Sequence, residues 1–244
     1  MNQLNIRHLA LILDGNRRWG KQHGIAMNID FYVQSGLLGQ DIARTVFDRG
    51  IDYLTIWIGS ISNLTKRSAL ELKALNKAYK KFFSDPDNLQ FMKERRIKID
   101  CFGRWRDLLE SSTITVIEKA LLETADFADS GKILTVLIGY DGSDERGEAL
   151  RNILNSAGEQ EKNLQSKELN NLLRKKSWTG HLPDVDLVIR TGSGIDPHNS
   201  AGFLSLLTDN VQYEFLDTLW PDFTPDNLSG ILNEFANRER RMGK

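Results

Sequence analysis

Short apolar runs alternate with longer amphipathic segments along almost the whole chain. Each run has five or six residues, which is too short for a helix, and polar or turn-forming residues bound it. Continuous apolar runs of this length are typical of buried strands in a parallel sheet. The runs predict strands at 9–13, 53–58, 97–102, 133–138, 185–189 and 211–215.

Between these runs, apolar residues recur at helical spacing. A helix that carries Leu37 and Ile42 on one face, for example, ends near Gly50. Further helices are predicted at 69–83, 111–127, 144–155, 167–173 and 225–236, with a short one that reaches 94–96. Polar segments without this spacing are expected to be loops at 19–30 and 59–67.

The alternation of strands and helices predicts an α/β fold. We expect a mainly parallel central sheet flanked by helices, with right-handed connections between the strands. The chain shows no linker, so a single domain is predicted over residues 1–244.

Composition narrows the possible partners and compartments. The 244 residues include 32 basic and 33 acidic ones, so no electrostatic attraction to nucleic acid is expected. The single cysteine, Cys101, excludes an intramolecular disulfide and a cysteine-cluster zinc site, and it favours the reducing cytoplasm. No apolar run approaches the roughly 18 residues of a membrane span, although peripheral contact with a membrane stays open.

The end of the first predicted strand carries the most informative residues. The run closes on Asp14, Gly15 and Asn16, and two arginines and a tryptophan follow. An acid at the carboxyl end of a buried strand, beside a glycine and paired cations, suits a metal ion and a phosphate. The alternative for these residues alone is a simple turn between a strand and a helix.

Six segments together resemble the cis-prenyltransferases, the family of undecaprenyl diphosphate synthase. The string HLALILDGNRRWGKQHG over 8–24 resembles the signature of that family. The resemblance continues at 51–55 with Ser60 and Asn63 beyond, 138–142, 185–192 and 219–223, and in the tail 237–243. It implies a cis-prenyltransferase-like fold with an apolar substrate tunnel, isoprenyl diphosphate substrates and Mg²⁺ as the cofactor.

The resemblance also implies roles for particular residues. Asp14 would bind the magnesium diphosphate, and Ser60 and Asn63 would lie near the reacting carbon. Diphosphates would be bound by Gly15, Asn16, Arg17, Arg18, Trp19, Lys66, Arg190, Thr191, His198 and Ser200. The guanidinium group of Arg190 suits this task because it matches phosphate oxygens in shape and charge.

Several aromatic residues and the tail receive weaker assignments. The aromatic residues that are candidates for lining the tunnel are Trp57, Phe82, Phe83 and Phe91. The alternative for each of them is that it packs in the hydrophobic core. The resemblance implies a homodimer in which the tail with Arg238, Arg240 and Arg241 reaches the partner subunit. The histidines His8, His23, His181 and His198 show no metal-binding spacing, so surface or loop positions are expected for most of them.

The chain departs from the family pattern at both diphosphate sites. Asn28 and Tyr32 replace an arginine and a histidine of the family, and Lys66 replaces an arginine. After Arg190, the loop lacks the next arginine of the family and offers His198, Asn199 and Ser200 instead. The metal-binding glutamate of the family falls on Gln212, with Glu214 as a second possibility because alternate residues of a strand share a face.

These departures leave three functions open. The first is an Mg²⁺-dependent prenyltransferase with a non-standard substrate or product, such as irregular coupling or cyclisation of allylic diphosphates like dimethylallyl diphosphate. The second is an ordinary synthase that elongates cis-polyprenyl diphosphates, and the third is a non-catalytic partner subunit. The intact Asp14 motif opposes the third. Chain lengths and the geometry of the product double bonds do not follow from the sequence.

Overall fold

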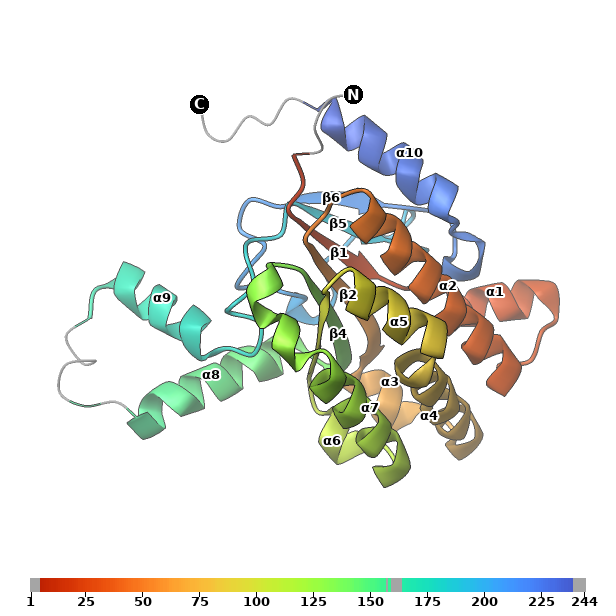
Figure 1. Cartoon of the computed structure of the whole chain (residues 1–244), viewed down its shortest axis with the longest axis horizontal. Helices are drawn as coiled ribbons and strands as arrows, with labels where there is room; N and C mark the ends of the chain where they lie inside the picture. Colours follow the sequence, from red (N-terminus) through yellow and green to blue (C-terminus); the bar gives the residue numbers. More distant parts are fainter. Residues whose placement is uncertain (1–4, 157, 159–163, 239–244) are drawn as a thin grey trace.

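The computed structural model describes residues 5–156, 158 and 164–238. Its centre is a parallel sheet of six described strands in the order β3-β4-β2-β1-β5-β6 (Figure 1). The strands are β1 (His8–Ile12), β2 (Tyr53–Ser60), β3 (Lys98–Phe102), β4 (Ile133–Tyr140), β5 (Leu187–Arg190) and β6 (Gln212–Phe215). Each of them matches a predicted strand, so the parallel α/β class is confirmed.

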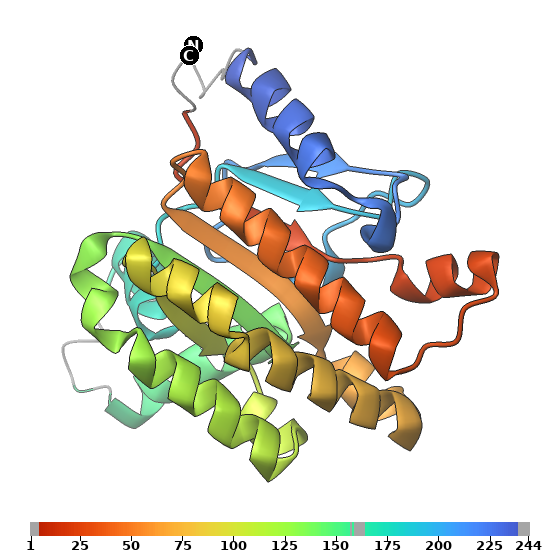
Figure 2. The ribbon, with the colours of Figure 1, turned by 45° about the vertical axis from the view of Figure 1, so that its right-hand side comes forward.

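Helices pack on both faces of the sheet. One face is covered by α2 (Ile29–Asp48), α4 (Ala69–Ser84), α5 (Pro86–Glu94), α7 (Ser111–Glu123) and α10 (Pro225–Ala236) (Figure 2). On the other side lie the long segment before and after β5 and the pair α8 (Gly142–Ser156) and α9 (Ser166–Lys176), which extends away from the sheet in Figure 1.

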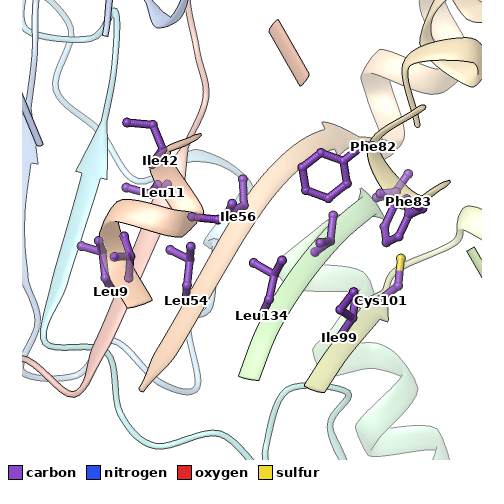
Figure 3. Packing of buried hydrophobic residues seen from close by; sticks show 14 of the residues in the cluster. Leu9, Leu11, Ile42, Leu54, Ile56, Phe82, Phe83, Ile99, Cys101 and Leu134 are labelled. Atoms are coloured by element: carbon purple, nitrogen blue, oxygen red, sulfur yellow. The ribbon is translucent and has the colours of Figure 1, made fainter. Parts of the chain in front are cut away.

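The main core lies between the sheet and the first group of helices. Leu9 and Leu11 of β1 and Leu54 and Ile56 of β2 point to this face, as alternate residues of a strand must (Figure 3). Their neighbours Ala10 and Ile12, with Trp57 of β2, pack into a second cluster on the opposite face. The central strands are therefore buried on both sides, which explains their continuous apolar runs.

Two segments predicted as loops contain short helices instead. α1 (Asn16–His23) and α3 (Ile61–Lys66) are largely polar, and each buries a single residue, Gly20 in α1 and Leu64 in α3. Such helices have no apolar stripe, so hydrophobic spacing cannot reveal them. The one-turn helix α6 (Trp105–Leu108) was likewise not predicted.

Other boundaries shift by about a turn or more. α2 begins at Ile29, well before the first residue of the predicted apolar stripe, because Asn28 caps it by accepting a hydrogen bond from the N–H of Phe31 at 3.0 Å. The helix predicted to end at Phe127 ends at Glu123 and continues as a 3₁₀ helix, η1 (Ala125–Ser130).

A buried polar network fixes the segment that follows β5. The hydroxyl of Tyr140 donates to Glu145 at 2.5 Å and accepts from the N–H of Leu204 at 3.2 Å. Glu145 also accepts from the N–H and the hydroxyl of Thr179, each at 2.8 Å. Because all of these polar groups are paired in the interior, they hold α8 and the segment around Leu204 in one arrangement.

Among the described helices, none combines the length and the apolar character needed to cross a membrane.

His8 does not have the surface or loop position expected for most of the histidines. Its side chain is fully buried in β1, where Nδ1 donates to the carbonyl of Pro183 and Nε2 lies within hydrogen-bond distance of the hydroxyl of Thr55, each at 2.9 Å. The neutral ring satisfies both partners, because the hydroxyl of Thr55 can donate to Nε2. Burial lowers the pKa of His8 to about 4.

We predict that His8 weakens the fold as the pH falls. The unfolded chain binds a proton on His8 near pH 6.5 and the folded chain only near pH 4, so between these values the unfolded state binds more protons. Between pH 7.5 and pH 5, the free energy of unfolding of the wild type should therefore fall by about 2 kcal/mol more than that of His8→Gln. Urea unfolding at both pH values measures this, with the exposed His23→Gln as the control. Equal pH dependence of His8→Gln and the wild type would contradict it.

Candidate active site

The carboxyl ends of three neighbouring strands, β2, β1 and β5, open into one cavity of about 560 Å³. Ligands of open α/β sheets bind at this edge. The polar side of the cavity is lined by Asp14, Gly15, Asn16, Arg17, Arg18, Ser60, Asn63, Arg190 and Ser200. The structure therefore brings together most of the site residues that the sequence predicts.

The other side of the cavity is apolar. It is lined by Ile56 and Ile58 of β2, by Gly39 of α2, and by residues of α4, namely Leu75, Ala78, Tyr79 and Phe82. Of the four tunnel candidates, Trp57 and Phe82 line the cavity. Phe83 and Phe91 do not, because both are buried in the main core.

Asp14 lies at the centre of the polar side. Its Oδ2 accepts a hydrogen bond from Nη2 of Arg190 at 2.9 Å, and its Oδ1 lies 3.4 Å from Nη2 of Arg18. The N–H of Gly15 donates to Oδ1 at 2.6 Å. The carboxylate is therefore held by two cations and one amide, and its side chain is still 40% exposed toward the cavity and solvent.

The backbone of Asp14 is fixed from β5. The hydroxyl of Thr191 accepts from the N–H of Asp14 at 2.9 Å and lies 2.7 Å from its carbonyl. The same carbonyl accepts from the N–H of Trp220 at 3.0 Å. Thr191 does not line the cavity, so the structure gives it a supporting place behind Asp14.

Gly15 makes the sharp turn from β1 into α1. Its φ is 104°, a conformation that a residue with a Cβ rarely adopts. A Cβ built on Gly15 would lie 2.8 Å from Cδ2 and 3.1 Å from the Cα of Leu219. The turn directs the first N–H groups of α1, which lack partners within the helix, to the same edge as Asp14.

Arg190 is the most enclosed cation of the site, with only 8% of its side chain exposed. Its Nη1 donates to the carbonyl of His198 and to the hydroxyl of Ser200, each at 2.7 Å. Its Nε is buried and has no partner among the described groups. His198 itself does not line the cavity, and its ring bonds to Ser200 at 3.0 Å.

Ser60, at the end of β2, and Asn63 of α3 line the cavity. Ser60 caps this helix by accepting from the N–H of Asn63 at 3.0 Å. The predicted diphosphate residue Lys66 is exposed and does not line the cavity, whereas the next residue, Arg67, does. Sequence reasoning missed Arg67, and its position directly after Lys66 was the only sign of it.

Asn28, the cap of α2, and Tyr32 within α2 are the two residues that replace cations of the family pattern. They differ in their position relative to the cavity. Asn28 caps the helix and does not line the cavity. Tyr32 lines it, and its hydroxyl accepts a hydrogen bond from Nη1 of Arg67 at 2.9 Å. Burial raises the pKa of Tyr32 above its usual value, with Arg67 opposing this shift. The phenol is therefore protonated at neutral pH.

The other predicted residues that the structure describes do not line the cavity. The indole of Trp19 donates to Asp222 at 2.7 Å, and Glu214 accepts from Arg238 at 2.6 Å. Gln212 begins β6, so it lies at the opposite end of this strand from the cavity edge. The tail residues Arg240 and Arg241 lie outside the described residues.

The donor set fits a magnesium ion that arrives with a diphosphate. No group of three or more His, Cys, Asp or Glu side chains among the described residues could hold a metal ion. Mg²⁺ commonly binds through one or two carboxylates together with substrate phosphates and waters. The carboxylate of Asp14 has lone pairs to spare beside its contacts with Arg190 and Gly15, so it meets this requirement.

Comparisons with known proteins agree along the whole chain. A family model described as "Putative undecaprenyl diphosphate synthase" matches residues 12–243. An isoprenyl transferase of Chlamydia pneumoniae is 32% identical over 249 residues, covering 97% of this chain and 92% of the relative. A tritrans,polycis-undecaprenyl-diphosphate synthase (geranylgeranyl-diphosphate specific) of Pyrococcus horikoshii is 30% identical over 239 residues, covering 98% of this chain and 87% of the relative.

A solved structure shares the fold. Lavandulyl diphosphate synthase from Lavandula x intermedia, in complex with dimethylallyl diphosphate, superposes with a TM-score of 0.85 and covers 99% of both chains. At 22% sequence identity, this likeness supports the architecture described above.

We predict that Gly15 tolerates no side chain. Gly15→Ala combines an unfavourable φ with a close approach to Leu219, and it should cost about 2–3 kcal/mol of stability. Gly24→Ala is the matched control, because Gly24 also has a positive φ, of 64°, but a Cβ there would meet no atom within 4 Å. It should cost only about 1 kcal/mol. Urea unfolding measures both, and equal losses would show that Leu219 does not restrict this turn.

Proposed function

The chain belongs to the undecaprenyl diphosphate synthase family and is a prenyltransferase, and we propose that it performs an Mg²⁺-dependent condensation of isoprenyl diphosphates with a non-standard substrate or product. The reactions that we propose are irregular coupling or cyclisation of allylic diphosphates such as dimethylallyl diphosphate. The observation that carries this proposal is one cavity in which Asp14, Arg18 and Arg190 face an apolar wall.

The two sides of the cavity match the two parts of an isoprenyl diphosphate. The polar side can bind the diphosphate through the guanidinium groups of Arg18 and Arg190 and through the first N–H groups of α1. The apolar side, which includes Ile56 and Phe82, can hold the hydrocarbon and exclude water from a reacting allylic carbon. When bound by Asp14, a magnesium ion supplies charge that stabilises the departing diphosphate.

The changes at Asn28 and Tyr32 support a non-standard reaction, because no basic residue lies between Gly24 and Arg44 to restore the cations of the family pattern.

Ordinary chain elongation is the second candidate. It is favoured by the names of the relatives, which include an undecaprenyl-diphosphate synthase specific for geranylgeranyl diphosphate. The third possibility, a non-catalytic partner subunit, is opposed by the intact contact between Asp14 and Arg190. Homodimer formation and a cytoplasmic location remain predictions from the resemblance and the composition.

The product distribution tests the proposal. Purified protein is incubated with Mg²⁺ and dimethylallyl, geranyl or farnesyl diphosphate, with and without isopentenyl diphosphate, and the dephosphorylated products are identified by mass spectrometry. We expect a coupled or cyclised product from dimethylallyl diphosphate without isopentenyl diphosphate. Products that grow by five carbons only when isopentenyl diphosphate is present would instead establish chain elongation. No product from any pairing would favour the partner subunit.

We predict that Asp14→Asn lowers kcat/KM by about 10²–10³-fold, because it removes the metal-binding charge while keeping the shape of the side chain. Asp222→Asn is the matched control. It makes the same change near the same edge of the sheet, but Asp222 contacts Trp19 and does not line the cavity. The ratio of kcat/KM between the two variants is the measurement. A ratio near one would show that Asp14 does not take part in catalysis.

A further inference from the structure

A second carboxylate, that of Asp141, lines the same cavity as Asp14. Asp141 lies between the last residue of β4 and the first residue of α8. Tyr140 at the end of β4 pairs in register with Ser60 at the end of β2, so Asp141 lies just beyond the strand end next to Ser60. Because β2 lies between β4 and β1, the two aspartates follow strands that are about 10 Å apart.

A close backbone contact holds the start of α8 against the segment that carries Ser200. A Cβ built on Gly142 would collide with the carbonyl of Gly202 and would lie 3.0 Å from the carbonyl oxygen of Ala201. Only glycine permits such an approach of two backbones. Asp141, which precedes this glycine, is therefore placed on the wall of the cavity next to the segment of Ser200 and Ala201.

The carboxylate of Asp141 has no cationic partner within the described part of the chain. Its Oδ1 accepts from the N–H of Ser143 at 2.8 Å, which fixes the side chain at the start of α8. Its Oδ2 makes no hydrogen bond or salt bridge to another described residue. The carboxylate of Asp14, in contrast, contacts two arginines. The lone pairs of Asp141 are therefore available to a group inside the cavity.

A prenyl condensation has to release one proton. The electron pair of a double bond in one substrate attacks C1 of the allylic diphosphate, and the C1–O bond breaks as its electron pair leaves with the diphosphate. A carbocation remains in the joined carbon chain. It becomes an alkene when a base removes a proton from an adjacent carbon and the C–H electron pair forms the new double bond. A carboxylate beside the carbon chain can accept that proton and pass it to solvent.

The other described residues that line the cavity do not suit this task. Asp14 is engaged by two arginines, and in the proposed function it also binds the metal ion. Burial raises the pKa of Tyr32 and of Tyr79, so both phenols are protonated at neutral pH. The arginines have no lone pair to offer, and the rest of the lining is neutral. Among these residues, Asp141 is the carboxylate that is free to accept a proton.

We propose that Asp141 is the general base that removes the proton from the carbocation. This inference rests on the proposed function and identifies a catalytic residue for it. It applies to irregular coupling, to cyclisation and to chain elongation, because each of them forms its new double bond by losing a proton. The half-buried position of Asp141 lets the carboxylate face the cavity and still exchange the proton with solvent.

The test compares two aspartates at the start of α8. Asp141→Asn removes the base, while its amide oxygen can still accept from Ser143. Asp144→Asn is the matched control, because Asp144 lies in the first turn of α8, accepts from Nε of Arg104 at 2.7 Å and does not line the cavity. The measurements are kcat, KM and the masses of the products in the assay with Mg²⁺.

We expect Asp141→Asn to lower kcat by about 100-fold and to change KM by less than about threefold, because the base acts after the substrates have bound. A carbocation that keeps its proton is open to attack by water, so products heavier by one water molecule should increase. Asp144→Asn should stay within about twofold of the wild type in kcat and should form the same products.

Asp141→Ser guards against an asparagine variant that fails to fold. Serine also caps helices but supplies no base at neutral pH, so the same loss of kcat and the same heavier products are expected. Wild-type kcat and products in both Asp141 variants would overturn this inference. The released diphosphate would then be the proton acceptor, and the proposed function would stand.

Two further outcomes would also overturn the role of Asp141. Equal losses in Asp141→Asn and Asp144→Asn would show a general effect of charge at the start of α8. A lower kcat without any increase in the heavier products would show a structural role. A wild type that forms no product from any pairing would overturn the proposed function together with this inference.

Discussion

The contact between Asp14 and Arg190 is the constraint around which the candidate active site is built. Arg190 ends β5 and pairs in register with Ile12 of β1, so Asp14 lies just beyond the neighbouring strand end. A guanidinium that is only 8% exposed is costly to leave without a counter-ion, and Asp14 supplies one at 2.9 Å. The sheet itself therefore places a carboxylate and a guanidinium side by side, before any substrate binds.

Other groups hold this pair in one geometry. Thr191 fixes the backbone of Asp14 from one side, and Trp220 bonds to its carbonyl from another. On the side of Arg190, the hydroxyl of Ser200 is held in a segment that the buried Tyr140 network anchors through Leu204. An anion that enters the cavity thus meets cations that are already oriented. Preorganised charge of this kind stabilises a leaving group without further rearrangement.

The sequence predicted those parts of the fold that depend on apolar patterning. The six strands, the parallel class and the position of Asp14 at a strand end all follow from buried runs and the residues that terminate them. The strand order does not follow from any one segment, because it depends on which runs pair. α1 and α3 were not predicted because each of them buries only one residue and so lacks the apolar spacing that indicates a helix. The sequence does not show that Arg67 lines the cavity and the adjacent Lys66 does not, because adjacent residues at the end of a helix point in different directions.

The apolar side of the cavity argues for a bounded hydrocarbon site. Gly39 lies on its wall, and a Cβ there would lie 3.7 Å from Phe82 and 3.9 Å from Trp220. Neither aromatic ring is free to move alone. Phe82 packs edge-on against the fully buried Phe83, and the indole of Trp220 donates to Ser35 at 3.0 Å. A longer hydrocarbon would have to displace rings that are part of the close-packed core, where changes of volume are poorly tolerated. The packing that stabilises α2 and α4 against the sheet therefore also forms this wall of the cavity.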